Sequence, residues 1–393
     1  MSFETLQKSE RALDKLLRYC RREEWSGYDP YDGLSIERGL SPALANRVVR
    51  TAIIQLNKRS PFNIRRLLGI KKGHNPKGLA LAARALVPLR SRSIEGIEDD
   101  LRFLIETLVS LRSPGYEEAC WGYNFDWQSR AFYAPRGTPN VVCTAYAANA
   151  LLDYYEATGD RLCYELAASS CRFLLNRLNR TEGASGICFS YTPLDHSRVY
   201  NVNLMAAELL ARAYAGGGDG EQREAALRAV DYCLNAQRED GSWYYGEARS
   251  QRWIDSFHTG FMLVSLKKIR EYLGEARWQG ALERGYRFYR DRFFLADSTP
   301  KYYHDRLYPV DVHSAAQAVI TYVEMAELMP DASEMATRCV EWSIDNLQDA
   351  AGYFYFQKQR FYTIKIPYMR WSQAWMLYAL STYLTRNQAR ENV

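Results

Sequence analysis

The chain has 393 residues, 47% of them hydrophobic and 13% aromatic, with a formal net charge of +5. This composition excludes a disordered protein, and the length suffices for a large core in one domain or two. There is no run of about 18 uncharged apolar residues, as a membrane span needs. The N-terminus is charged throughout and unlike a secretory signal, so we expect a cytoplasmic protein.

The first 95 residues do not follow the pattern of the rest of the chain. Their apolar spacing predicts helices at 3–22, 41–58 and 76–92. Their breaker residues predict a turn at 28–33 and the end of a helix at Ser60-Pro61. We expect this helical, basic segment, 1–95, to supply a lid or a first hairpin to a larger domain of residues 96–393.

The same segment is strongly basic. Between Glu37 and Glu95 there is no acidic residue, but there are 13 lysines and arginines, beginning with Arg38. Either this is a solvated helical face, or it binds an anion such as a lipid headgroup, a pyrophosphate or an acidic glycan. In the second case the protein would be peripheral to an anionic membrane, through Arg65, Arg66, Lys71 and Lys72. The stretch contains no nucleic-acid recognition module, so we expect no nucleic-acid partner.

The cysteines are expected to be reduced thiols in the core. They include no C-x-x-C pair, and several occupy apolar helical positions, which argues against disulfides or a zinc site. The eight are Cys20, Cys120, Cys143, Cys163, Cys171, Cys188, Cys233 and Cys339.

One unit recurs through the C-terminal two thirds of the chain: a polar residue followed by a long apolar helix. The starts are 61, 54, 56 and 59 residues apart, at Asn140, Asn201, Asp255, Asp311 and Arg370. In most repeats the residue five positions after the start is small, which lets helices pack closely. More amphipathic stretches precede four of the later starts, at 161–178, 222–237, 278–294 and 332–347. The pattern predicts buried inner helices alternating with outer helices.

Each connection from an outer to an inner helix is long and rich in glycine and aromatic residues. Loops of this length are normally functional or contain short strand pairs. We therefore predict an all-α toroid of helical hairpins, with long, partly β-hairpin loops around a mouth at one end.

This pattern resembles the (α/α)6 toroid superfamily of glycosidases, polysaccharide lyases and sugar epimerases, over roughly residues 100 to 386. Weaker local similarities point to the terpene cyclase and prenyltransferase toroids. Gln237-Arg-Glu-Asp-Gly-Ser-Trp243 fits one Q-x3-G-x-W repeat, and Asp255-Ser-Phe-His258-Thr resembles a D-x-x-H-T motif. The acid motif and the other zinc ligands of those families are absent, so we interpret both matches as features of a shared hairpin.

The loop before the first repeat is typical of a sugar-binding cleft. It combines aromatic rings with an acid and a guanidinium, and such rings pack on the C–H faces of sugars. The same aromatics would also suit a plug of the toroid. The candidate substrate-binding residues of this loop are Trp121, Tyr123, Asp126, Trp127 and Arg130.

The starts of the inner helices carry the candidate catalytic residues. Two of the five histidines in the chain, His258 and His313, follow Asp255 and Asp311 by three and two positions. Paired carboxylates would suit glycosidic hydrolysis, and a histidine base with cationic or amide donors would suit proton abstraction next to a uronate. Further substrate-binding candidates at these starts and the adjoining loops are Asn140, Asn201, Asn203, Tyr245, Arg370 and Trp371.

No cofactor or metal is expected. The four catalytic candidates are possible metal ligands, but no H-E-x-x-H signature accompanies them, and no P-loop, G-x-G-x-x-G or G-x-S-x-G motif is present.

Three functions stay open at this point. The first is an enzyme acting on an oligosaccharide or lipid-linked glycan in polysaccharide biosynthesis or modification, by lyase, epimerase or hydrolase chemistry. The second is an isoprenoid-handling toroid, and the third is a non-catalytic glycan-binding scaffold. The substrate partner is therefore expected to be a glycan. The candidate residues favour a glycan that contains a uronate.

Overall fold

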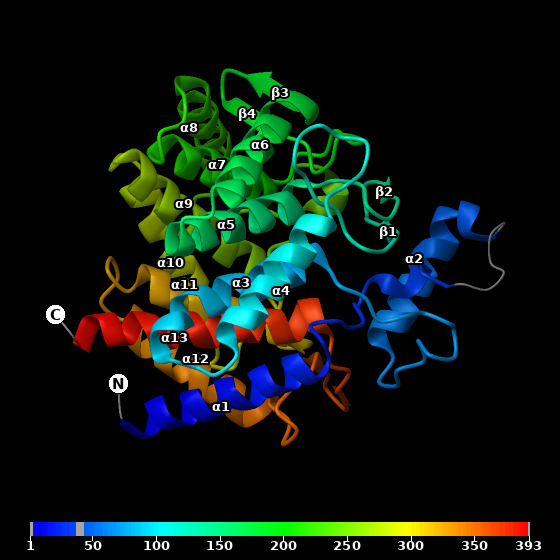
Figure 1. Ribbon diagram of the computed structural model, residues 1–393. Coiled ribbons are helices and arrows are strands. Elements are labelled where there is room, and N and C mark those ends of the chain that lie inside the picture. Colours follow the sequence, from blue (N-terminus) through cyan, green and yellow to red (C-terminus); the bar gives the residue numbers. More distant parts are fainter. Residues whose placement is uncertain (1–2, 37–42, 392–393) are drawn as a thin grey trace.

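The computed structural model describes residues 3–36 and 43–391, which fold into helices with a few short strands (Figure 1). The helices are α1 (Phe3–Arg22), α2 (Arg47–Arg59), α3 (Pro76–Leu86), α4 (Ile97–Ser110), α5 (Val141–Thr158), α6 (Arg161–Arg177), α7 (Tyr200–Ala215), α8 (Gly220–Asn235), α9 (Ser256–Leu273), α10 (Gln279–Phe293), α11 (Val312–Met325), α12 (Ala332–Leu347) and α13 (Ala374–Glu391). A π-helical turn, Met369–Gln373, precedes α13.

Six helices form a closed inner ring. In ring order they are α3, α5, α7, α9, α11 and α13, and each packs on the next, with α13 returning to α3. These helices are apolar nearly all round, as buried helices must be. Gly260 on α9 shows how closely two of them approach, because a Cβ there would lie 2.7 Å from Gln317 and Thr321 of α11.

An outer layer of helices covers this ring. Here α4, α6, α8, α10 and α12 pack on the inner helices α3, α5, α7, α9 and α11, while α1 packs on α12 and α13. The predicted toroid of hairpins is therefore confirmed. Helix α4 was not predicted, and α1 and α3 of the N-terminal segment belong to the two rings. The proposed boundary at residue 95 stays a prediction.

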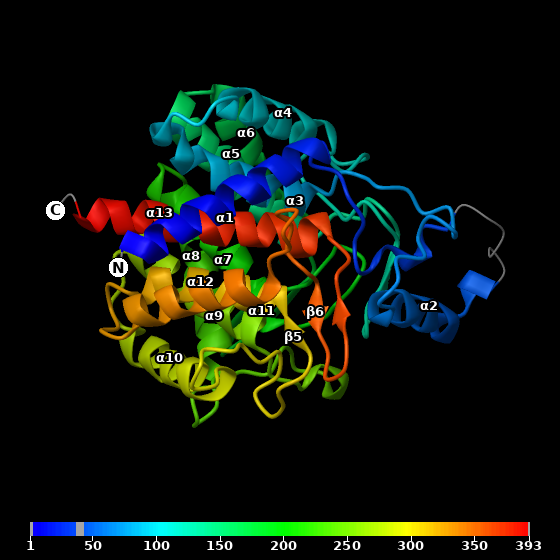
Figure 2. The same cartoon turned by 90° about the horizontal axis from the view of Figure 1, so that it is seen from below.

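Seven short strands lie in the connections between hairpins. Strands β1 (Trp127–Gln128) and β2 (Tyr133–Ala134) pair antiparallel, as do β3 (Arg180–Gly183) and β4 (Gly186–Phe189). Strands β5 (Val310–Asp311), β6 (Gln357–Lys358) and β7 (Thr363–Ile364) form one antiparallel sheet. The β1–β2 hairpin and the β5–β6 pair lie at the same end of the molecule as α2, opposite the termini (Figures 1 and 2).

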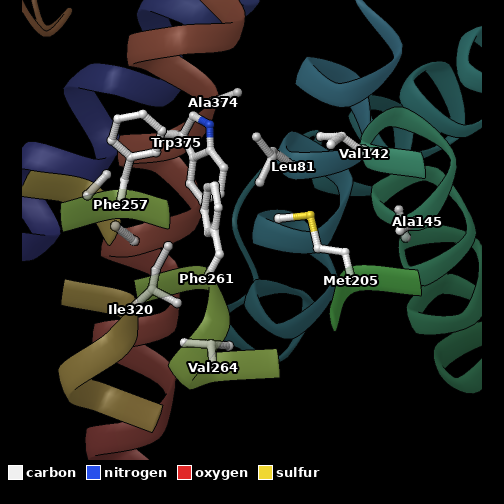
Figure 3. Packing of buried hydrophobic residues seen from close by; sticks show 14 of the residues in the cluster. Leu81, Val142, Ala145, Met205, Phe257, Phe261, Val264, Ile320, Ala374 and Trp375 are labelled. Atoms are coloured by element: carbon white, nitrogen blue, oxygen red, sulfur yellow. The ribbon is translucent and has the colours of Figure 1, made fainter. Parts of the chain in front are cut away.

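Aromatic side chains fill the centre of the inner ring. Trp375 on α13 and Phe261 on α9 stack with ring centroids 5.3 Å apart, and Figure 3 shows them beside Phe257 and across from Met205. Trp375 occupies the position that is small in the other repeats. Side chains therefore close the ring at its centre, and the larger open space lies toward the helix starts.

The Q-x3-G-x-W segment has a structural role. The Gln237 side-chain amide donates to the carbonyls of Gly241 (3.1 Å) and Ala281 (2.9 Å), which joins the loop after α8 to α10. A second segment does the same: Gln348 donates to Gly352 (3.1 Å) and to Ala12 of α1 (2.9 Å). The motif thus fastens neighbouring outer helices.

All eight cysteines are free and buried, as predicted. Among the described helices, none has the length and apolarity required to cross a membrane.

Candidate functional site

A cavity of about 510 Å³ lies at the N-terminal ends of the inner helices. Its wall comes from α2, the β1–β2 hairpin, the starts of α3, α7, α9 and α11, and the β6–β7 region. Fourteen aromatic rings line it: Tyr31, Tyr123, Phe125, Trp127, Phe132, Tyr191, Tyr245, Trp253, Phe257, Phe261, Tyr302, Tyr303, Tyr362 and Trp371. This is the size and lining of a site for a small polar ligand.

The polar part of the wall consists of cations, imidazoles and amides. It comprises Lys58, Arg59, Lys77, Arg130, Arg370, His258, His313, Gln55, Gln128, Gln251, Gln357, Gln359, Asn201 and Ser129. Among the described residues no aspartate or glutamate lines the cavity. The site is therefore electropositive and rich in hydrogen-bond donors, which favours an anionic or hydroxyl-bearing ligand.

The structure brings nine of the fifteen predicted site residues to this cavity: Tyr123, Trp127, Arg130, Asn201, Tyr245, His258, His313, Arg370 and Trp371. They come from five different connections, so the toroid brings the helix starts to one mouth. The remaining six lie behind the cavity wall or outside it.

Four of those six do not line the cavity, and each makes a hydrogen bond to backbone groups elsewhere. Trp121 is buried and donates to the Leu108 carbonyl (2.7 Å), and Asp126 accepts from the Arg136 backbone N–H (2.7 Å). Asn140 caps α5 by accepting from Cys143 N–H (2.9 Å). Asn203 lies between α7, α8 and β4, where it bonds the backbone of Phe189, Ile187 and Ala229. None of the four lines the cavity, and a substrate-binding role for them stays a prediction.

The two aspartates, Asp255 and Asp311, cap the helices that present the histidines. Asp311 is fully buried; it accepts from His313 N–H (2.8 Å) and Trp371 Nε1–H (3.0 Å), and from the Gln357 amide. Burial raises the pKa of its carboxyl group. Neither aspartate lines the cavity, so they position residues that do.

His258 forms the clearest catalytic arrangement. Its Nδ1 lies 2.7 Å from Asp255 Oδ2, which also accepts from Trp253 Nε1–H at 2.8 Å. Because a carboxylate only accepts, Nδ1 must carry the proton, and Nε2 of the neutral ring is then free to accept one. The imidazole is 22% exposed and packs against Tyr245, with centroids 4.5 Å apart. A histidine held in this tautomer is suited to general-base catalysis.

His313 lies deeper and in a different environment. It is 1% exposed, stacks on Phe257 (4.5 Å, 15°) and contacts Trp371 and Trp375. Neither ring nitrogen has a hydrogen-bond partner among the described residues. Burial, and then the positive charges of Lys77 and Arg370, hold the pKa of His313 well below its usual range. It is a neutral imidazole whose nitrogens are available to a ligand.

Arg370 is held by an acid that the sequence did not reveal. Its guanidinium makes two bonds to Asp29, at 2.5 and 2.7 Å, and faces the ring of Tyr123. Asp29 comes from the segment after α1, far away in the chain. The pair leaves Arg370 ordered and nearly neutralised at the cavity wall.

Sequence reasoning missed Lys58 and Lys77. Lys58 donates to the Tyr31 hydroxyl (2.7 Å), and Lys77 lies over the rings of Tyr146 and Trp375. A signal for Lys77 was present, since Asn75-Pro76 is a cap and first-turn proline ahead of an apolar helix. It marks the start of a further inner helix, which the repeat search did not include.

Only some of the cations in the basic stretch are exposed on the surface. Arg65 is fully buried, paired with Asp32 (2.7 Å) and the Asp29 carbonyl (2.9 Å), so it cannot meet a membrane as predicted. Arg66, Lys71 and Lys72 are exposed, and Lys72 pairs with Glu23. Arg38 lies outside the described residues. Within the described part of the chain, no group of three or more potential ligands is arranged to hold a metal ion.

Comparison with known proteins gives a likeness of fold. No protein-family model matches the chain, and no curated protein matches its sequence. Among solved structures, it is similar to cellobiose 2-epimerase from Bacillus thermoamylovorans (TM-score 0.65, 10% identity, covering 80% of this chain and 88% of that one). It is also similar to an unsaturated glucuronyl hydrolase specific for heparin (0.64, 12%, 99% and 98%).

A third similar structure is the α-mannanase from Bacteroides thetaiotaomicron (TM-score 0.58, 13% identity, covering 81% of this chain and 88% of that one). The three share the double ring of helices, and the protein is an (α/α)6 toroid. At these identities the likeness establishes the architecture alone, and the chemistry has to be argued from the cavity.

Proposed function

We propose that the protein is a carbohydrate-active enzyme that moves a proton at a sugar carbon, in an epimerase or lyase type of reaction. The observation that carries this proposal is the pair Asp255–His258 at the wall of a cavity without carboxylates. The structural neighbours that act on sugars are consistent with it.

The proposed chemistry starts at His258. Its Nε2 takes a proton from the carbon next to a carbonyl or carboxylate group, and the electron pair moves onto that group to form an enolate. Cationic and hydrogen-bonding side chains around the cavity, Arg370 and Tyr245 among them, stabilise the negative charge. Return of a proton on the other face gives an epimer, whereas loss of the group on the next carbon gives an unsaturated sugar.

Other candidate functions fit the cavity less well. Hydrolysis by two carboxylates requires an acid and a base that flank the glycosidic bond. No carboxylate side chain lines the described wall. An isoprenoid site would be lined almost wholly by aromatic rings, whereas this wall also carries five lysines and arginines and two histidines. A non-catalytic glycan-binding protein would not need a histidine fixed in one tautomer.

The proposal is tested by exchange of carbon-bound hydrogen in heavy water. The wild-type protein is incubated with reducing disaccharides and uronate oligosaccharides, and NMR follows loss of C–H signals and appearance of epimers or alkenes. We expect exchange with at least one sugar, and loss of at least a hundredfold in His258→Gln with the melting temperature unchanged. Sugar hydrolysis without exchange, or exchange that survives in the variant, would contradict the proposal.

We also propose, as a second property, that α2 and the following segment dock on an anionic membrane, which would suit a lipid-linked glycan in polysaccharide biosynthesis. The supporting observation is that large apolar side chains are exposed there next to cations: Leu56 (71%), Phe62 (75%) and Leu67 (85%) lie near Arg59 and Arg66. Apolar insertion and attraction to anionic lipids act together in such surfaces.

The membrane proposal is tested by co-sedimentation with vesicles of phosphatidylcholine alone or with phosphatidylserine. We expect binding only to the anionic vesicles, and a loss of at least tenfold in affinity in Phe62→Ser/Leu67→Ser. Lys15→Ser, on the exposed face of α1, serves as the control. Equal sedimentation of the double variant and the wild type would remove the proposal.

A further inference from the structure

Lys77 is a buried amine at the floor of the cavity. Its backbone N–H is capped by Asn75 (3.1 Å) in the first turn of α3, which directs the side chain inward. The residue is 3% exposed, and Nζ lies 4.7, 4.9 and 5.4 Å from the ring centres of Tyr146, Trp375 and Phe261. Those rings come from α5, α13 and α9, so Nζ lies among three helices of the inner ring.

No described side chain neutralises this amine. It has no hydrogen bond and no ion pair with the described residues, although it lines the cavity. Aromatic faces attract an ammonium only weakly compared with the hydration that it loses. A buried lysine without a counter-ion is costly, and this one is placed where a ligand can reach it.

None of the surrounding groups offers the Lys77 amine a free negative charge. Burial, followed by the positive charge of Arg370, lowers the pKa of Lys77 to about 7. The charge of Asp29 acts on Lys77, but both of its carboxylate oxygens are taken by Arg370. Burial raises the pKa of the Cys143 thiol to about 12, and His313 is neutral. Burial likewise raises the pKa of Tyr146, so that phenol is also neutral.

We propose that Lys77 is the anion site of the substrate: it binds an oxyanion on the sugar, a carboxylate or a phosphate, and takes up a proton when that group arrives. The inference rests on the proposed function, because it assumes that the cavity holds a sugar, and it narrows the substrate class to a sugar acid or sugar phosphate. Arg370 and His313 lie beside the same position and can donate hydrogen bonds to the anion.

Lys58 provides a matched comparison within the same cavity. Burial disfavours its charge, but the hydroxyl of Tyr31 and the carboxylate of Asp311 outweigh burial and raise its pKa. Lys58 therefore carries its proton before any ligand binds, whereas Lys77 acquires one on binding. The two lysines should both contribute to affinity, but only Lys77 should couple binding to protons.

The experiment is isothermal titration calorimetry at pH 8 in two buffers of different ionisation enthalpy, which counts the protons bound per ligand. The probes are a glucuronate-containing disaccharide, its neutral counterpart and a hexose phosphate. For the wild type we expect uptake approaching one proton with an anionic probe and none with the neutral sugar. Preference between the two anionic probes identifies carboxylate or phosphate as the natural group.

The variants separate charge from proton uptake. Lys77→Met should lose at least tenfold in affinity for the anion and all uptake, and Lys77→Arg should bind with no uptake because its charge is permanent. Lys58→Met should weaken binding yet keep the uptake. His258→Gln should keep both while losing hydrogen exchange, so failure of the anion site and failure of the proposed function are distinguishable. The proposal is overturned if neither anion binds with proton uptake, or if Lys77→Met binds like the wild type.

Discussion

His258 and His313, which follow a capping aspartate by three and two positions, acquire different chemistry in the fold. His258 reaches back to its capping aspartate and stays partly open to the cavity, whereas His313 turns into an aromatic cluster and has no described partner. Their shared place in the first turn of an inner helix did not distinguish the two. What separates them is which way each ring turns relative to the cap, and neighbouring helices decide that.

The residue-scale prediction concerns Asp255→Asn. Asparagine is as good a helix cap as aspartate, so the melting temperature should change little. It does not hold the Nδ1 proton as a carboxylate does, so the rate of hydrogen exchange should fall by about 10²–10⁴, as expected when a histidine loses its orienting carboxylate. The pH–rate profile should also shift, and a purely structural role for Asp255 would leave that profile unmoved.

Among the helices, a chain of ion pairs joins three neighbours of the inner ring at the end away from the cavity. Arg84 of α3 and Arg212 of α7 both bond Asp153 of α5, at 2.8 and 2.7 Å. Burial acts to raise the pKa of Asp153, but the two guanidinium groups outweigh it and lower the pKa to about 2. The folded-state pKa lies below the unfolded value, so this carboxylate stabilises the fold above pH ~4, and the contribution is lost as the pH falls toward 2.

We predict that Asp153→Asn lowers the free energy of unfolding by about 3 kcal/mol at pH 7, because it removes the paired acid of buried Arg84 and leaves buried Arg212 with Glu156 alone. The deficit should shrink as the pH falls toward 2, where the wild-type carboxylate is protonated as well. Urea unfolding at pH 7 and at low pH measures both effects. Asp99→Asn, on the exposed face of α4, should change stability by less than about 0.5 kcal/mol.

At the scale of the whole molecule, the two ends of the chain close the toroid. Helix α1 is the first element and packs on the last two, α12 and α13, while α13 also packs on α3. Leu13, Leu16, Leu17 and Cys20 of α1 are all buried in this contact region. Helices that lie far apart in the sequence therefore close the ring, which couples α1 and α13 to the stability of the whole.

Substitution of Leu16 by alanine tests this coupling. The side chain is fully buried, so the change should lower the free energy of unfolding by about 2–5 kcal/mol. The Leu16→Ala variant should unfold in one transition, with the same midpoint by circular dichroism and by tryptophan fluorescence. The control, Lys15→Ala on the exposed face of α1, should have nearly the stability of the wild type. Early melting of α1 alone, with the rest of the toroid intact, would show that closure is not cooperative.

Much of the architecture was predictable because its signals are local. The spacing of polar starts and apolar runs depends on each helix alone, and it correctly placed the inner helices α5, α7, α9, α11 and α13 and the outer helices between them. The sequence also placed nine of the candidate residues at one mouth, because equivalent positions of a repeat lie at the same end of a toroid. At Asn140 and Asn203 it could not distinguish a structural residue from a ligand, since a polar residue at a helix start serves equally as cap or as ligand.

The tertiary structure alone decided what depends on distant parts of the chain. Asp29 meets Arg370 across 341 positions of sequence, and that contact takes up both oxygens of an acid whose charge acts on Lys77. Arg65 looked like a surface cation until Asp32 and Tyr368 enclosed it. Helical periodicity depends on residues that are close in the sequence. The burial of a side chain, its ion-pair partner and the charge of a cavity depend on residues that only the folded ring brings together.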